Sequence, residues 1–108
     1  ELILPYESSS VDSNFHLYVL QVKENRYFDR YDLYTFLQSI GYLPMVHYIP
    51  VHFLSYYKDR FGYKVGDFPV AECYYSRAIS LPLYPTLTDN EVEKVVEDVS
   101  KFITGKKV

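Results

Sequence analysis

The sequence predicts an α+β domain, a two-layer sandwich in which a small, mainly antiparallel three-stranded sheet carries its helices on one face. Two observations predict this class. The chain has 108 residues, a length that suits one compact domain with its own hydrophobic core. Short apolar runs typical of strands alternate with stretches of helical periodicity, in the order β-α-β-α-α-β-α.

The N-terminal part of the chain predicts a linker, a strand and a helix in succession. Residues 1–14 are rich in serine and have little to bury, so we expect a linker there. Residues 15–22 are aromatic and β-branched on both faces, as in a strand that is covered on both sides, or covered on one side and part of an interface on the other. The helix that follows is expected to begin at Asp29, whose carboxylate can accept from free N–H groups. It is expected to end at Gly41, which can adopt the left-handed conformation.

The middle of the chain predicts a second strand and two short helices. Residues 43–49 form the second apolar run, and Pro50 ends it because proline cannot donate to a strand ladder. The aromatic residues 51–61 predict a short helix or turn. Pro69 predicts the start of another helix, since the N–H that proline lacks is not needed in a first turn. Residues 78–83 predict a short strand, which Pro82 makes either an edge strand or one that breaks early.

The C-terminal helix has the clearest signals. Thr88 and Glu91 form a capping box, in which the threonine hydroxyl accepts from the N–H of Glu91 and the carboxylate reaches back. The helix then carries one apolar stripe, and Gly105 is expected to end it. Asp98 is among the charged residues expected to face water. The stripe consists of Val92, Val95, Val96, Val99, Phe102 and Ile103.

Charge and composition exclude several classes of protein. The formal net charge of −3 argues against a nucleic-acid binder, including a sheet that stacks RNA on its tyrosines. No apolar run approaches the ~18 residues that a membrane span needs, and no signal-peptide pattern occurs. The single cysteine, Cys73, permits no internal disulfide, which favours a reducing compartment. We therefore expect a cytoplasmic protein without a nucleic-acid or membrane partner.

Aromatic side chains are unusually frequent, with thirteen tyrosines, seven phenylalanines and no tryptophan. Tyrosine combines an apolar ring with a polar tip, so it suits interfaces as well as cores. We therefore expect that part of the aromatic surface is covered by a partner, and that one face of the sheet is left for it.

Residues 45–52, MVHYIPVH, hold the most unusual chemistry, because His47 and His52 lie five positions apart across a proline. Their spacing matches no metal-ligand pattern, and the four glycines show no phosphate-binding spacing. Cys73 on a predicted helix is typical of a small buried hydrophobe rather than of a nucleophile. Two interpretations of the histidines stay open: they bond to backbone groups, or they face a pocket formed with another domain.

Three stretches taken together resemble one family: VHYIPVH (residues 46–52), DFPVAE (67–72) and ISLPLYPTLTDNEVEKVV (79–96). They are similar to the C-terminal small domain of the DegT/DnrJ/StrS sugar-nucleotide aminotransferases, which are pyridoxal-phosphate enzymes of the aspartate aminotransferase fold. The resemblance covers residues 15–104. Within the group it is most similar to the transaminases of pseudaminic acid biosynthesis.

The resemblance implies a domain organisation. Residues 1–14 would be a linker from a large domain that lies outside this chain, and residues 15–108 would be the C-terminal small domain. The large domain would bind pyridoxal 5′-phosphate and supply the Schiff-base lysine, so the chain alone is expected to be inactive. A small domain of this kind completes the active site of a homodimer, which would account for the aromatic excess.

The resemblance also implies a reaction and a set of contacts. The full-length protein would transfer an amino group, from glutamate as donor, to a UDP-linked 4-keto-6-deoxy-hexose. His47, Tyr48 and His52 would be substrate-side contacts, and Pro50 would shape their loop by fixing its backbone angle. The alternative comes from a different class of protein: a free-standing, non-catalytic α+β module that binds a partner through an aromatic sheet face.

Overall fold

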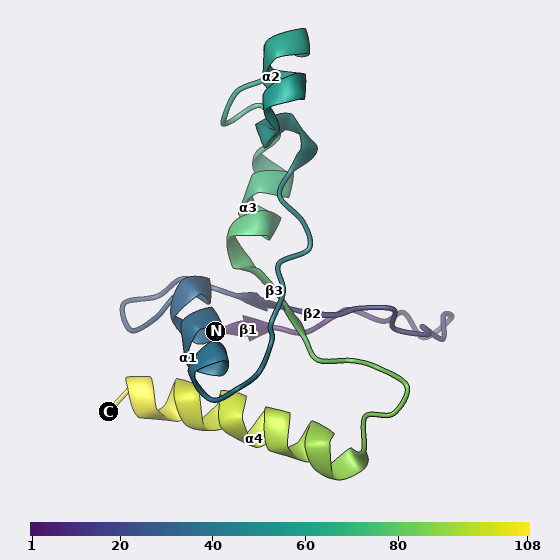
Figure 1. Ribbon diagram of the computed structural model, residues 1–108, viewed down its shortest axis with the longest axis vertical. Helices are drawn as coiled ribbons and strands as arrows, with labels where there is room; N and C mark the ends of the chain where they lie inside the picture. Colours follow the sequence, from purple (N-terminus) through teal and green to yellow (C-terminus); the bar gives the residue numbers. More distant parts are fainter.

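The computed structural model describes residues 1–108 and confirms the α+β class, with a three-stranded antiparallel sheet (Figure 1). The strand order is β1-β2-β3. Leu2 lies opposite Val22 in the first pair of strands, and Leu20 lies opposite Ile79 in the second. The strands are β1 (Leu2–Ile3), β2 (Tyr18–Val22) and β3 (Ala78–Leu81).

Five helical segments surround the sheet, and none has the length and apolar character needed to cross a bilayer. Helices α1 and α4 pack on one side of the sheet, while α3 rises away from it and leads to η1 and α2 (Figure 1). The segments are α1 (Arg30–Ser39), the 3-10 helix η1 (Val51–Phe53), α2 (Ser55–Phe61), α3 (Pro69–Arg77) and α4 (Asp89–Lys106).

The identity of one strand differs from expectation. Residues 43–49 do not form a strand, because only Met45 pairs with β3. The Met45 N–H donates to the Ser80 carbonyl (3.2 Å), and its carbonyl accepts from the Ser80 N–H (2.8 Å). In an antiparallel ladder the next hydrogen-bonded pairs would join residue 43 to 82 and residue 47 to 78. Pro82 has no N–H, and the N–H of Ala78 already donates to the Tyr74 carbonyl, so the ladder stays one residue long. The third strand is instead β1, which lies inside the segment expected to be a linker.

The hydrophobic core lies between the sheet and helices α1 and α4. Leu33 and Leu37 of α1 are fully buried, as is Ile79 of β3, and Val99 and Phe102 of α4 close the other side. Burying an apolar side chain of this size contributes roughly 1.5–3 kcal/mol. The sheet, α1 and α4, which we call the body (residues 1–45 and 78–108), therefore carry a core of their own.

The helix ends confirm the predicted caps. The Asp29 carboxylate accepts from the Asp32 N–H, and the Asp32 carboxylate accepts from the Asp29 N–H, both at 3.0 Å. Gly41 follows α1 with φ of 95°, in the left-handed region that favours glycine. Thr88 Oγ1 accepts from the Glu91 N–H (3.3 Å), and Glu91 Oε2 accepts from the Thr88 N–H (2.8 Å).

The apolar stripe of α4 is only partly buried. Val95, Val99 and Phe102 enter the core, whereas Val92 and Val96 remain 43% and 58% exposed. The stripe is wider than the surface that α1 and the sheet offer it, so its outer edge faces solvent. Gly105 does not end the helix, which continues to Lys106 because nothing in the exposed last turn requires a left-handed residue.

Asp98 of α4 is buried rather than facing water. Its carboxylate accepts from the Tyr42 hydroxyl (2.9 Å) and from the Lys94 ammonium (2.7 Å). The Lys94 and Tyr42 hydrogen bonds hold the pKa of Asp98 below its usual value, while burial and the carboxylate raise the pKa of Tyr42. This contact fixes the turn after α1 onto α4.

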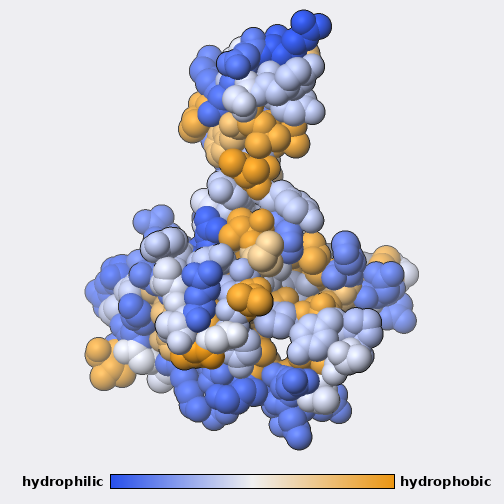
Figure 2. All heavy atoms as spheres, viewed as in Figure 1, coloured by the Kyte–Doolittle hydropathy of each residue, from blue (hydrophilic) through white to orange (hydrophobic).

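Residues 46–77 form an arm that projects from the body and contains η1, α2 and α3 (Figure 1). The chain measures 48 × 38 × 27 Å, and its radius of gyration is 16.0 Å. A compact domain of this length would have a radius of gyration of about 13 Å. Figure 2 shows hydrophobic residues gathered along the arm below a hydrophilic tip. The arm therefore exposes apolar surface that the body does not cover.

Candidate functional site

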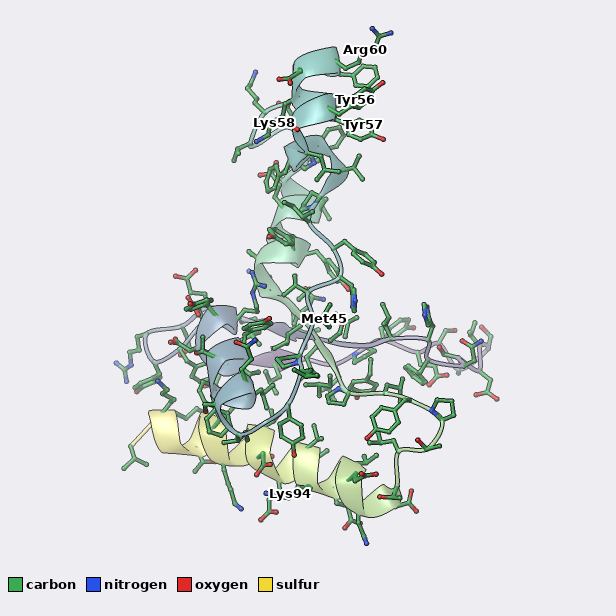
Figure 3. All side chains as sticks on the ribbon, viewed as in Figure 1. Met45, Tyr56, Tyr57, Lys58, Arg60 and Lys94 are labelled. Carbon is green, nitrogen blue, oxygen red and sulfur yellow. The ribbon has the colours of Figure 1, made fainter.

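The three predicted site residues lie where the chain leaves the sheet and enters the arm. The Met45–Ser80 bridge holds the outgoing segment to β3, and Met45 lies at the base of the arm (Figure 3). The returning helix α3 ends at Arg77, and its C-cap residue Ala78 is the first residue of β3. Both ends of the arm are thus attached to the same strand, which fixes the starting direction of residues 46–53.

His47 is held against the sheet. Its Nδ1 atom lies 2.8 Å from Oγ of Ser80, a buried residue of β3, and the two atoms form a hydrogen bond. The imidazole ring is half-buried and packs on the ring of Tyr48, with 4.6 Å between the centroids. One ring nitrogen of His47 is therefore engaged by the protein itself.

Tyr48 faces outward, with 70% of its surface exposed. Its hydroxyl forms no hydrogen bond within the chain. With Phe68, Val70 and Tyr74 it lines an open hollow of about 640 Å³ on the side of α3. Of the three predicted residues, Tyr48 is the one whose polar tip is available to a ligand or to another domain.

His52 has the opposite surroundings, because it is 6% exposed. Its ring packs against the rings of Phe53 (4.5 Å between centroids) and Phe68 (4.8 Å). Its Nε2 atom lies 2.8 Å from Oε1 of Glu72 on α3. The structure therefore does not bring His47 and His52 to one shared polar cluster, since each ring bonds to a different element.

Glu72 joins the three segments of the arm. Besides contacting His52 of η1, its carboxylate accepts from the N–H of Gly66 (2.8 and 3.0 Å) and of Phe68 (3.4 Å). The His52 hydrogen bond is the main reason that the pKa of Glu72 lies below its usual value, and the two N–H groups add to it. The loop between α2 and α3 is thus tied to α3 and, through Glu72, to η1.

Sequence reasoning missed Glu72 as a site residue, although it lies in the stretch DFPVAE. Gly66, which has φ of 97°, lets the chain turn so that its N–H meets the carboxylate. A glycine in a loop followed by a glutamate in the first turn of a helix was the available signal. What the sequence did not show was that His52, twenty positions earlier, is the partner.

The structure also bears on two other kinds of site, a metal site and a reactive cysteine. No group of three or more histidine, cysteine or acidic side chains could hold a metal ion. Cys73 is exposed on α3, so the expectation that it is a buried hydrophobe is wrong. The arm has no apolar core that would cover the thiol, since His52 is its one buried residue.

The lysines of this chain do not fit a pyridoxal-phosphate site. A Schiff-base lysine must lose its proton readily, whereas the hydrogen bond to Asp98 raises the pKa of Lys94. Lys94 projects from α4 of the body, apart from the arm that carries the predicted site (Figure 3). The other lysines are exposed: Lys23, Lys58, Lys64, Lys101, Lys106 and Lys107.

Comparison with known sequences identifies a family. The profile of the DegT/DnrJ/EryC1/StrS aminotransferase family matches residues 1–100. The spore coat polysaccharide biosynthesis protein SpsC of Bacillus subtilis is 44% identical over an alignment 108 positions long, which covers 96% of this chain and 27% of SpsC. The chain therefore spans about a quarter of the length of such relatives.

Solved structures show the same arrangement of elements. The PLP form of the putative sugar aminotransferase Spr1654 from Streptococcus pneumoniae is 26% identical, with a TM-score of 0.84 over 97% of this chain and 27% of that chain. Helicobacter pylori PseC, an aminotransferase involved in the biosynthesis of pseudoaminic acid, is 26% identical, with a TM-score of 0.73. That match covers 83% of this chain and 24% of PseC.

Proposed function

We propose that this chain, which belongs to the DegT/DnrJ/EryC1/StrS aminotransferase family, is the C-terminal small domain of a sugar-nucleotide aminotransferase. The family match over residues 1–100 carries the proposal. Residues 1–14 would connect to a large domain, with β1 as the point where the connection joins the sheet, and residues 15–108 would form the small domain. The large domain would bind pyridoxal 5′-phosphate, because the lysines of this chain do not fit that cofactor.

The proposed reaction is transfer of an amino group from glutamate to a UDP-linked 4-keto-6-deoxy-hexose in the cytoplasm, for amino-sugar biosynthesis. The likeness to PseC supports an enzyme of the pseudaminic acid type. The full-length protein would act as a homodimer, and part of the exposed aromatic surface would be covered in that assembly.

The proposed contacts to the substrate are His47, Tyr48 and His52. Tyr48 offers an exposed hydroxyl that can bond to a sugar oxygen. His47 supports it, because its ring bonds to Ser80 and packs on the tyrosine ring. His52 lies deeper in the arm, where its second ring nitrogen is the only polar atom of the side chain left for a ligand.

The test uses the full-length protein that contains these residues, assayed for amino transfer to the keto-sugar nucleotide. Replacing Tyr48→Phe removes one hydroxyl and should raise the KM for the sugar nucleotide about tenfold, with a smaller change in kcat. Tyr31→Phe is the matched control, since Tyr31 is 68% exposed on α1 of the body. Equal KM values for the two variants would contradict the role of Tyr48.

A second measurement tests which domain binds pyridoxal 5′-phosphate. The 108-residue chain mixed with pyridoxal 5′-phosphate should show no absorbance of an internal aldimine. Such absorbance would contradict the proposal that the large domain holds the cofactor. Absence of amino transfer in the full-length protein would instead favour the non-catalytic binding module.

A further inference from the structure

The arm contains a hollow of about 510 Å³, open to solvent, which we call the arm hollow. Its lining is mostly apolar and aromatic, and the residues that matter here are Pro50, His52, Tyr57, Phe61, Tyr63 and Phe68. A volume of this size lies in the range of pockets that hold small ligands, which commonly combine apolar walls with a few polar groups.

The rings of the arm hollow contact one another in a continuous row. Tyr57 and Phe61 are stacked with 6.1 Å between centroids, and Phe61 lies 5.7 Å from Tyr63. Tyr63 lies 5.4 Å from Phe68, whose ring in turn contacts His52. A row of contacting rings offers flat, rigid faces, and such faces suit another planar ring.

His52 brings an unpartnered polar atom to this wall. The side chain is 6% exposed, and its one hydrogen bond is made through Nε2. No side-chain nitrogen or oxygen of the chain is both sealed from solvent and without a partner, so Nδ1 reaches a surface. His52 forms part of the lining of the arm hollow, so we place Nδ1 at that lining.

The contact with Glu72 determines which ring nitrogen of His52 carries the hydrogen. The carboxylate already accepts from the N–H groups of Gly66 and Phe68, so it acts as an acceptor toward His52 as well. Nε2 must then carry the hydrogen, and Nδ1 of the neutral ring carries a lone pair. Among the aromatic walls of the arm hollow, Nδ1 is therefore a group that accepts and cannot donate, whereas the hydroxyls of Tyr57 and Tyr63 can do either.

We propose that the arm hollow binds the pyrimidine base of a uridine nucleotide, with the N3–H of the base donating to Nδ1 of His52. This inference rests on the proposed function, from which the nucleotide comes, and adds a place for its base. Uracil is planar and carries an N–H donor on its ring edge, whereas cytosine carries an acceptor at the same position. Glu72 is then a positioning residue, which holds His52 in the form that selects uracil.

Arg60 supplies a charge suited to the phosphate. It follows Tyr57 by three residues and so lies on the same side of α2, from whose end it projects (Figure 3). The guanidinium is exposed and forms no ion pair with any carboxylate of the chain. A planar guanidinium can bond to a phosphate through two N–H groups.

The test is calorimetric titration of the 108-residue chain at pH 8 with UMP, CMP and N3-methyl-UMP. UMP should bind about tenfold more tightly than the other two, because they place an acceptor or a methyl group against Nδ1. This comparison needs no substitution, so it does not depend on whether a variant folds. Equal binding of UMP and CMP, or no binding of either, would overturn the proposal.

Substitutions test which residues cause the preference for UMP over CMP. His52→Phe keeps the ring but removes the acceptor and should abolish the preference for UMP, while His16→Phe, at an exposed position of the body, should leave it unchanged. Glu72→Gln can donate to Nε2, so it should bring UMP and CMP to nearly equal affinity. Arg60→Gln should weaken UMP and CMP alike, by about fivefold.

The outcome also separates this inference from its alternatives. Self-association of the chain that is lost in His52→Phe would assign the arm hollow to a protein partner and overturn the proposal. Amino transfer by the full-length protein is measured independently. Failure of nucleotide binding with intact transferase activity would reject the base site alone, and binding without activity would reject only the proposed reaction.

Discussion

The body and the arm are stabilised in different ways. The body buries apolar side chains from the sheet, α1 and α4 in one cluster, in which Leu33, Leu37 and Ile79 are fully buried. In the arm, His52 is the one buried residue, and it is polar. Its bond to Glu72, together with two backbone N–H groups, holds η1, the loop and α3 in place.

The difference shows which region is free to serve function. The body uses its apolar residues for its own core, whereas the arm leaves Tyr48, Val51, Phe61 and Val70 between 56% and 83% exposed. Exposed apolar residues gathered on one projecting element are typical of surfaces that bind something else. The directional hydrogen bonds of His52 and Glu72 can hold the arm in shape, so its apolar residues need not be buried in a core.

The largest effect should follow from opening the core of the body. Leu33 is 0% exposed, so Leu33→Ala should lower the free energy of unfolding by about 3 kcal/mol. Leu54→Ala, at a residue of the arm that is 40% exposed, should cost less than about 1 kcal/mol. Urea denaturation followed by circular dichroism measures both. Equal costs would mean that arm and body share one core.

A smaller effect should follow from removing the cap of α4. Thr88→Ala leaves the Glu91 N–H without its side-chain acceptor and should cost about 1 kcal/mol. Thr86→Ala is the control, because Thr86 is exposed and precedes the helix. Thermal unfolding compares the two variants. A cost that Thr86→Ala reproduces would show that the cap does not stabilise the body.

The exposed edge of α4 should be nearly neutral in this chain. Val96→Ser, at a residue that is 58% exposed, should change the free energy of unfolding by less than about 0.5 kcal/mol. Val99→Ser, one turn on and 5% exposed, should cost about 2 kcal/mol. Chemical denaturation of the pair distinguishes the buried from the exposed edge of the stripe, and similar losses would place Val96 in the core.

The most local effect concerns protonation of Glu72. Its pKa in the folded chain is lowered, so its stabilising contribution is complete above the usual glutamate pKa and is lost as pH falls through the lower folded value. The amide signals of Gly66 and Phe68 in NMR spectra should therefore shift with a midpoint below pH 4.5, the value for a free glutamate side chain.

The control for this titration is Glu72→Gln, in which the two amide signals should lose the part of the shift that Glu72 causes, while the carboxylate of Asp67 between them is unchanged. Amides of the body core should shift less, because the carboxylate lies in the arm. A midpoint at or above the usual value in the unaltered chain would mean that His52 and the two N–H groups do not hold the carboxylate in solution.

Local sequence patterns predicted those parts of the fold whose cause lies within a few residues. The N-cap at Asp29, the capping box at Thr88, the turn at Gly41 and the helix start at Pro69 are all confirmed. Each depends on hydrogen bonds or backbone angles of near neighbours. The family resemblance carried by the three quoted stretches is also confirmed, by the match over residues 1–100.

The wrong strand predictions have a different cause, because strand pairing depends on residues far apart in the sequence. The pairing of β1 with β2 joins residues about twenty positions apart, and two residues are too few to show a strand pattern of their own. Residues 43–49 have the pattern of a strand, but the chain leaves the sheet after Met45. Whether an apolar run forms a strand depends on which segment of the chain lies beside it in the folded structure.

The sequence by itself determined the helices, their caps, the α+β class and the family of this protein, because those signals are local or are carried by contiguous stretches. Only the tertiary structure decided that Asp98 is buried, that Val96 is not, and that the arm stands away from the body. It also decided that His52 meets Glu72 across a loop. Burial and long-range hydrogen bonds depend on which distant segments meet, and spacing along the chain does not contain that information.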